Sequence, residues 1–225
     1  LPISDIGRTK AQLSTKILGA VQRDHDDEFE LQLPGTLRIE KYTEVLNWYK
    51  NPLNRDYSKA LEIEVAGVPH VFAWGGLHGA IPQYFGEGYF INVDVASYYP
   101  SLTLVYKWIS RNVADPSKYE EIYHTRLKLK AEKNPMQQPY KIVLNSTYGA
   151  MKDRHNAMYD PRQANNVCVG GQLLLLDLIE RLEDHCDIIQ SNTDGILIKL
   201  RHYDDYELID DICWEWEERT GMRLE

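Results

Sequence analysis

The sequence predicts a mixed α/β fold, in which the strands of a sheet are accompanied by helices. Residues 89–95 alternate in character and are rich in aromatic and β-branched side chains, a pattern typical of a strand. Two further apolar segments, 187–190 and 195–200, flank turn residues 191–194 and predict a β-hairpin. Residues 171–182 have the apolar spacing of a long helix, so both kinds of element are present.

More elements are predicted on either side of these. Helical spacing marks residues 13–21, 42–49, 100–109, 116–133, 139–148 and 206–219. Short apolar stretches separated by Pro and Gly predict strands at 31–33, 37–39, 61–65 and 68–73. Residues 75–79, Gly-Gly-Leu-His-Gly, are expected to form a flexible loop, and Gly221 is expected to end the last helix.

Length and composition fit one folded domain, or one domain with a small lobe. The chain has 225 residues, of which 43% are hydrophobic, enough to bury a core. No apolar run approaches the ~20 residues of a membrane-spanning helix, and the start does not resemble a signal peptide. We therefore expect a cytoplasmic protein with no membrane partner. Three widely spaced cysteines predict neither a disulfide framework nor a zinc site.

The net charge of −9 argues against a nucleic-acid partner, because proteins that bind polyanions usually carry a basic surface. The objection is partial. Acidic residues are what a magnesium-dependent phosphoryl-transfer site requires, since Mg²⁺ prefers oxygen ligands.

Two aspartates are the first candidates for such chemistry. Asp94 lies at the end of a predicted strand, and Asp194 lies in the turn of the predicted hairpin. Strand ends and hairpin turns of one sheet can converge, so the two carboxylates can share a site. Two Mg²⁺ ions about 3.5–4 Å apart can activate an attacking hydroxyl and stabilise a leaving oxygen. The alternative for each aspartate is ordinary turn chemistry, in which the side chain bonds its own backbone.

The residues around the aspartates decide between these alternatives. Residues 94–101 read D-V-A-S-Y-Y-P-S, residues 141–149 read K-I-V-L-N-S-T-Y-G, and residues 192–195 read N-T-D-G. In this order they resemble motifs A, B and C of the phage-type family B DNA polymerases, which are D-x-x-S-x-Y-P-S, K-x-x-x-N-S-x-Y-G and D-T-D-S. The resemblance covers roughly residue 75 to the end.

The resemblance implies an antiparallel polymerase palm sheet with helices on one face and a short two-helix fingers subdomain. Residues 1–74 would be an N-terminal segment that packs on the palm. Residues 75–110 would be palm with motif A, 111–157 fingers with motif B, and 158–225 palm with the motif C hairpin. The exonuclease and thumb domains of the parent chain would be missing.

The resemblance also implies a role for each matched position in motifs A and C. Asp94 and Asp194 would bind two Mg²⁺ ions, for which Mn²⁺ can substitute, with the Val95 carbonyl as a backbone ligand. Ser97 and the backbone through Tyr98 and Tyr99 would bind the incoming triphosphate, and Tyr99 would exclude a 2′-hydroxyl. The alternative for the two tyrosines is core packing.

The predicted fingers helices would supply the cationic part of the site. Lys141, Asn145 and Tyr148 share one helix face, so Lys141 is a candidate phosphate clamp and the other two would face the nascent base pair. Arg126 and Lys130, four residues apart, resemble a further phosphate-binding pair, although this spacing is equally common on solvated helices. Candidate contacts with primer-template DNA are Gly75, Gly76, Gly149 and Thr193.

The chain departs from the family at three positions. Asn192 and Gly195 stand where motif C has its first Asp and its Ser, which puts metal affinity in doubt because one negative charge is missing. Ala73 stands where the family's Y-x-G-G loop has Tyr, so a simple glycine turn is the alternative for Gly75 and Gly76.

The predicted function is that of a DNA-directed DNA polymerase core, which adds deoxynucleotides to a primer 3′-hydroxyl in a bacterial or phage-infected cell. We expect the isolated segment to have low activity, because no thumb is present to hold primer-template DNA. Two alternatives stay open at this point. The segment could be a polymerase-like nucleic-acid-binding platform, or a metal-dependent nuclease that uses the same carboxylates.

Overall fold

The computed structural model describes residues 9–225, which divide into two compact units. The helical unit comprises residues 9–31 and Leu102–Val167, and the sheet unit comprises Gln32–Ser101 and Cys168–Glu225. The predicted subdomain ranges stay a prediction. In the described part of the chain, no helix is both long and apolar enough to cross a membrane.

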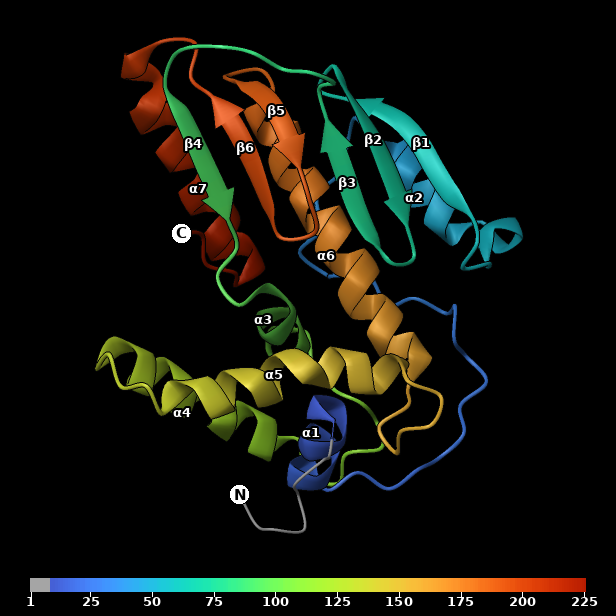
Figure 1. The fold of residues 1–225 in the computed structure, drawn as a ribbon. Coiled ribbons are helices and arrows are strands. Elements are labelled where there is room, and N and C mark those ends of the chain that lie inside the picture. Colours follow the sequence, from blue (N-terminus) through green and yellow to red (C-terminus); the bar gives the residue numbers. More distant parts are fainter. Residues whose placement is uncertain (1–8) are drawn as a thin grey trace. The chain divides into compact units, whose positions relative to one another are not determined.

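The sheet unit contains a six-stranded sheet in the order β1-β2-β3-β5-β6-β4, shown in Figure 1. Every pairing is antiparallel. The strands are β1 (Ala60–Val65), β2 (Val68–Ala73), β3 (Gly76–Ala80), β4 (Phe90–Asp94), β5 (Asp187–Ser191) and β6 (Gly195–Lys199). The predicted mixed α/β fold with an antiparallel sheet is therefore confirmed.

Local sequence explains the hairpins of this sheet. Ala66 and Gly67 connect β1 to β2 with φ angles of 53° and 74°, and two consecutive positive φ angles define the tight turn whose twist matches that of antiparallel strands. β5 and β6 flank a turn of residues 192–194, one residue shorter than predicted because Ser191 ends β5, and the backbone N–H of Asn192 donates to the Gly195 carbonyl at 3.0 Å.

Three helices cover one face of the sheet in Figure 1: α2 (Thr43–Lys50), the C-terminal part of α6 (Pro161–Leu182) and α7 (Tyr206–Thr220). Trp216 of α7 is fully buried, and its Nε1 donates to the Leu174 carbonyl of α6 at 2.9 Å. Gly221 ends α7 in the left-handed conformation, with φ 78°, as predicted. Helices on one face of the sheet, as expected, leave the other face open.

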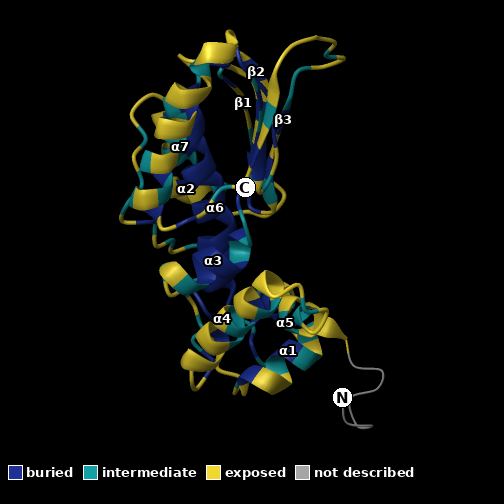
Figure 2. Ribbon diagram, turned by 90° about the vertical axis from the view of Figure 1, so that its left-hand side faces the viewer, coloured by how far each residue is buried: buried dark blue, intermediate teal, exposed yellow. Residues whose placement is uncertain are grey.

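The helical unit is built on α1 (Lys10–Leu18), α4 (Ser117–Ala131) and α5 (Gln137–Lys152). Thr9 and Gln12 form a capping box at the start of α1, and Gly19 ends it with φ 69°. Buried residues of α5 alternate with exposed ones at helical spacing, as the colours of Figure 2 show. A short helix, α3 (Tyr98–Val105), runs across the boundary between the two units.

Two predictions of local structure were wrong. Residues 31–33 and 37–39 form no strands. Backbone groups there form local bonds or bind side chains: the Leu31 and Leu37 N–H groups donate to the Phe29 and Pro34 carbonyls, and the Arg38 N–H donates to Asp177 at 2.8 Å. Glu180 accepts from the next three amides, those of residues 40–42. Most of the predicted 75–79 loop is strand β3, because its backbone pairs with β2 and β5 and Leu77 is buried.

Arg219 is predicted to stabilise the sheet unit through a buried ion pair. Its guanidinium donates to both oxygens of Asp177, at 2.7 and 2.8 Å, and the Asp177 side chain is fully buried. Arg219→Met would remove both of these hydrogen bonds and leave the carboxylate with only the guanidinium of Arg181, whose Nε lies 3.5 Å from Oδ1 of Asp177. We therefore expect a loss of about 2 kcal/mol of unfolding free energy in chemical denaturation.

The matched control is Arg223→Met, because Arg223 pairs with Glu218 at 3.5 Å while both side chains are more than half exposed. We expect this change to cost less than about 0.5 kcal/mol. Equal losses for the two variants would contradict the role given to Asp177.

Candidate active site

Asp94 is the last residue of β4 and its side chain lies on the open face of the sheet. Exposed Phe90, Asn92 and Asp94 alternate with the more buried Ile91 and Val93, as expected for a strand with one covered face. β4 therefore places the Asp94 carboxylate on the uncovered side of the sheet.

Asp194 lies in the turn of the β5–β6 hairpin and is also exposed. Its backbone N–H donates to Oδ1 of Asn192 at 3.2 Å, so the Asn192 side chain closes the turn. An Asp at position 192 could accept the same hydrogen bond. Asn192 in place of the first Asp of motif C therefore removes a negative charge from this turn but keeps the side-chain oxygen that accepts the hydrogen bond.

The register of β4 against β6 places the two aspartates side by side. Asp94 is the cross-strand partner of Gly195, the residue after Asp194, and the Val95 N–H donates to the Asp194 carbonyl at 2.8 Å. Gly195 has no side chain, and a Cβ there would lie 2.0 Å from Oδ1 of Asp94. Gly195 in place of the Ser of motif C thus leaves space that the Asp94 carboxylate occupies.

Negative charge gathers at this end of β4. The pKa of Asp94 is raised above its usual value, first by burial and then by the charges of Asp194 and Glu225. Within residues 9–225, no basic side chain forms an ion pair with Asp94 or Asp194. The pair is therefore left with negative charge that the described protein does not neutralise.

Glu225 was missed by sequence reasoning. Residues 223–225 lie along the end of β4: the Ala96 N–H donates to the Arg223 carbonyl at 2.8 Å, and the backbones of Asp94 and Glu225 exchange two hydrogen bonds. Leu224 forms an isolated bridge with Val95. A three-residue pairing has no periodic pattern, so only the acidic character of Glu225 could have drawn attention to it.

Motif A continues from Asp94 into a strained turn. Ser97 has φ 46°, the left-handed region that non-glycine residues rarely adopt, and its carbonyl accepts from the Ser101 N–H at 2.8 Å. This turn reverses the chain between β4 and α3. The predicted nucleotide-binding backbone therefore lies directly beside the carboxylate at the end of β4.

The two tyrosines of motif A have different environments. Tyr98 is buried and its hydroxyl donates to the Gly171 carbonyl of α6. Its side chain is therefore packed in the core, and the predicted triphosphate contact of its backbone is untested. Tyr99 is half-buried, so its ring stays partly accessible.

Two of the predicted DNA contacts are brought together. Gly76 begins β3 with φ 151°, and a Cβ at this position would lie 3.0 Å from Oγ1 of Thr193 in the hairpin turn. Gly75 precedes it in the β2–β3 connection. The glycine pair therefore lies beside the turn that carries Asp194, although its predicted contact with DNA is untested.

The candidate residues of motif B form an exposed stripe on α5. Lys141, Asn145 and Gly149 are exposed and Tyr148 is half-buried, whereas the opposite side of the helix is buried within the helical unit. The ammonium of Lys152 lies 5.7 Å from the centre of the Tyr148 ring. The sequence prediction that these residues share one face is confirmed.

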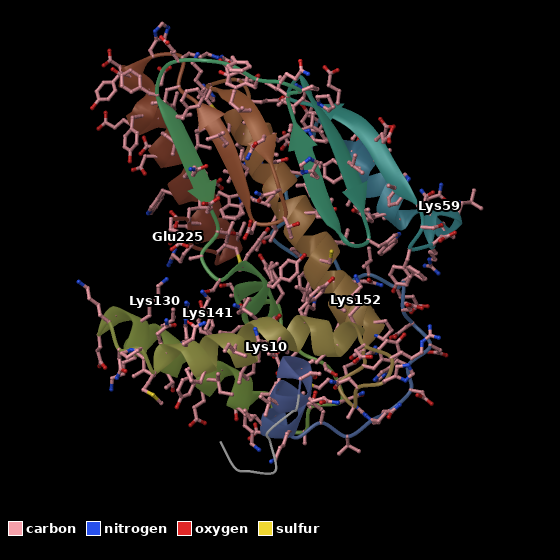
Figure 3. The ribbon with its side chains drawn as sticks, viewed as in Figure 1. Lys10, Lys59, Lys130, Lys141, Lys152 and Glu225 are labelled. Atoms are coloured by element: carbon pink, nitrogen blue, oxygen red, sulfur yellow. The ribbon has the colours of Figure 1, made fainter. Side chains whose placement is uncertain are left out.

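The two candidate phosphate-binding residues on α4 differ in how far they are buried. Lys130 is exposed and lies on the same side of the α4–α5 pair as Lys141 in Figure 3. Arg126 is only 6% exposed, and its Nε donates to Oε1 of Gln137 at 3.2 Å. Arg126 thus connects α4 to α5, and its predicted part in phosphate binding is not favoured by this burial.

The carboxylate pair fits a divalent cation in its chemistry. Asp94, Asp194 and the Val95 carbonyl offer the oxygen atoms that Mg²⁺ and Mn²⁺ accept, and the uncompensated charge at Asp94 would be relieved by a cation. In the described residues, no group of three or more His, Cys, Asp or Glu side chains is gathered closely enough to hold a metal. A metal here would depend on two carboxylates.

The chain has limited similarity to known proteins. No protein-family model and no curated protein match the chain. Among solved structures, the chain is similar to the family B DNA polymerase from the hyperthermophilic archaeon Pyrobaculum calidifontis, with 18% identity and a TM-score of 0.45. The match covers 74% of this chain and 26% of the polymerase, so this chain spans about a quarter of its length. The predicted phage type stays a prediction.

Asp94→Asn is predicted to stabilise the metal-free protein. A raised pKa means that ionised Asp94 opposes folding: the penalty is absent below the unfolded pKa, about 3.9, grows as the pH rises from there toward the folded pKa, and is complete above the folded pKa. The variant should therefore melt higher than the parent by a few degrees at pH 7, with no gain below pH 4. Thermal unfolding at the two pH values measures both effects.

Asp56→Asn is the matched control of opposite sign. Asp56 accepts hydrogen bonds from the Ser58 side chain and backbone, which hold its pKa below the usual value. This variant should lower the melting temperature at pH 7. A lower melting temperature for Asp94→Asn as well would contradict the repulsion inferred at the end of β4.

Proposed function

We propose that this chain is part of the catalytic core of a DNA-directed DNA polymerase of family B. The observation that carries the proposal is the β4–β6 register, which places the aspartates of the two motifs next to each other on an open sheet face. Residues that match a motif only in sequence would have no reason to meet in this way. The reaction would transfer a nucleotide from a deoxynucleoside triphosphate to a primer 3′-hydroxyl.

The acidic residues would hold the metal ions of such a reaction. Asp94 and Asp194 would bind two Mg²⁺ ions through carboxylate oxygens, with the Val95 carbonyl as a further ligand. When bound, such ions lower the pKa of the attacking hydroxyl and stabilise the charge of the leaving pyrophosphate. Asn192 contributes no charge, so we expect weaker metal binding than a third carboxylate at that turn would give.

The turn after β4 would bind the triphosphate. Ser97 begins a chain reversal whose next amides start α3, and N–H groups at a helix start attract phosphate oxygens. Tyr99 would then lie under the sugar, where a rigid ring can exclude a 2′-hydroxyl. These roles rest on the resemblance to motif A and on the accessibility of Tyr99.

The exposed stripe on α5 is the part of the helical unit that would bind phosphate. Lys141 carries an exposed ammonium that can pair with phosphate, while Asn145 and Tyr148 follow it on the same helix face. Lys130 offers a second exposed cation on α4. We expect Lys141 to contribute more than Lys130, because only Lys141 belongs to a fully matched motif.

A second candidate is a nucleic-acid-binding platform that keeps the fold but does not catalyse. It is favoured by Asn192, which forms the turn without supplying the acidic group of motif C. Magnesium-dependent deoxynucleotide binding with measurable primer extension would exclude it. A metal-dependent nuclease gives no role to Tyr99 or to the α5 stripe, and cleavage of labelled DNA without nucleotide would detect that activity.

Asp194→Ala should abolish primer extension by the parent protein without unfolding it. The expected loss follows from removing one of the two carboxylates proposed to hold the ions. Asp204→Ala is the control, because Asp204 is an exposed acidic residue of a short 3₁₀ helix, η3 (Tyr203–Asp205). Extension by the Asp194 variant at the parental rate, in a radiolabelled primer assay, would exclude the assignment.

Tyr99→Ala should relax the choice of sugar, because the space taken by the ring would then admit a 2′-hydroxyl. The ratio of deoxynucleotide to ribonucleotide incorporation measures this directly, and we expect it to fall at least about tenfold. Tyr98→Phe is the control: it removes a buried hydroxyl from the neighbouring tyrosine and should lower stability while leaving the ratio unchanged. Unchanged discrimination in the Tyr99 variant would contradict its proposed role.

A further inference from the structure

The seam between β3 and β5 is the shortest pairing in the sheet. These strands share two cross-strand pairs, Gly79 with Ser191 and Ala80 with Gln190, whereas the other neighbouring strands share four to six. One backbone hydrogen bond, from Ile81 N–H to the Ile189 carbonyl at 3.1 Å, extends the contact. The hairpin that carries Asp194 therefore joins β1–β3 across a seam with few backbone bonds.

A buried histidine spans this seam on the covered face of the sheet. His70 of β2 is the cross-strand partner of Gly79, which in turn is the partner of Ser191. Nε2 of His70 lies 2.6 Å from Oγ of Ser191, so one side chain connects β2 to β5 across the whole width of β3. Both residues are 1% exposed, which means that water does not compete for the bond.

The direction of this hydrogen bond follows from the other ring nitrogen. Nδ1 of His70 lies 2.8 Å from the Val68 carbonyl, which can only accept, so Nδ1 carries a proton. Burial lowers the pKa of His70 and favours the neutral ring. Nε2 of the neutral ring then accepts a hydrogen bond from the Ser191 hydroxyl.

Gly79 is what makes the span possible. A Cβ at Gly79 would lie 2.3 to 2.6 Å from three atoms of the His70 ring, far inside any permitted contact. The ring can therefore lie over β3 and reach Ser191 only because residue 79 has no side chain. Ser191 is the last residue before the turn that holds Asp194.

We propose that His70 is a positioning residue, which acts through Ser191 to fix the hairpin turn that presents Asp194 beside Asp94. The proposal gives no contact between His70 and substrate. Its importance for catalysis rests on the proposed function, whereas its structural effect on the turn does not. Nothing in the motif resemblance points to His70, Gly79 or Ser191.

Amide hydrogen exchange tests the positioning directly. Three amides report on the turn: those of Asn192 and Asp194, and that of Val95, which donates to the Asp194 carbonyl. Ser191→Ala should raise their exchange rates about two- to tenfold relative to amides of helix α7, as expected for loss of one buried hydrogen bond. Unchanged relative rates would overturn the proposal.

A double-mutant cycle separates the bridge from general packing. Gly79→Ala should accelerate exchange at the turn, because the added methyl displaces the His70 ring. In the His70→Ala background the same change should add nothing, because there is no ring left to displace. Equal effects of Gly79→Ala in the two backgrounds would overturn the bridge, and Ser191→Ala provides the test if a Gly79 variant does not fold.

Tyr42→Phe is the matched control for loss of a buried hydroxyl elsewhere in the sheet unit. The Tyr42 hydroxyl donates to Glu183 and accepts from the Ala66 N–H at the β1–β2 turn, the opposite end of the sheet from Asp194. This variant should leave the relative exchange rates of the Asp194 turn unchanged. Acceleration there as large as in Ser191→Ala would overturn the proposal.

Manganese binding distinguishes this proposal from the proposed function. If Asp94 and Asp194 bind Mn²⁺, Ser191→Ala should weaken that binding by about two- to tenfold and Tyr42→Phe should not, as measured by electron paramagnetic resonance. Unweakened binding in Ser191→Ala would overturn the role of His70 in placing Asp194. If the parent protein binds no Mn²⁺, the proposed function fails, while the exchange rates still decide whether His70 fixes the turn.

Discussion

The register of β4 against β6 is the constraint on which the rest of the site depends. Side chains alternate along a strand, so a slip of one residue would turn Asp94 toward the covered face of the sheet. The pairing of Asp94 with Gly195 prevents this, and the hydrogen bond from Val95 to the Asp194 carbonyl fixes the turn against the end of β4. Placement of the two carboxylates is thus a consequence of backbone pairing.

Bringing acidic groups together opposes folding unless another part of the molecule compensates. The raised pKa of Asp94 shows that its ionised form is disfavoured in the folded protein. Compensation comes from the buried parts of the sheet unit, where Asp177 binds Arg219 and Trp216 is fully covered. A stable scaffold that tolerates repulsion at its open face is suited to cation binding, because the cation supplies the missing charge.

Sequence patterns predicted the parts of this fold that are governed by local periodicity. The strand ending at Asp94 and the hairpin around residues 191–194 are both present. Strand β3 was predicted as a loop, because its glycines have no strand propensity and its structure comes from pairing with both neighbours. Glu225 and the bridge from His70 to Ser191 depend on contacts between distant segments, which periodicity does not encode.

Crystals of this chain soaked in manganese chloride would test the central claim most directly, through anomalous scattering from the metal. We predict a manganese peak between the carboxylates of Asp94 and Asp194, within the usual range of metal–oxygen bonds. Absence of any peak at a concentration that saturates carboxylate sites, with the two side chains on opposite faces of the sheet, would contradict the claim that they form one site.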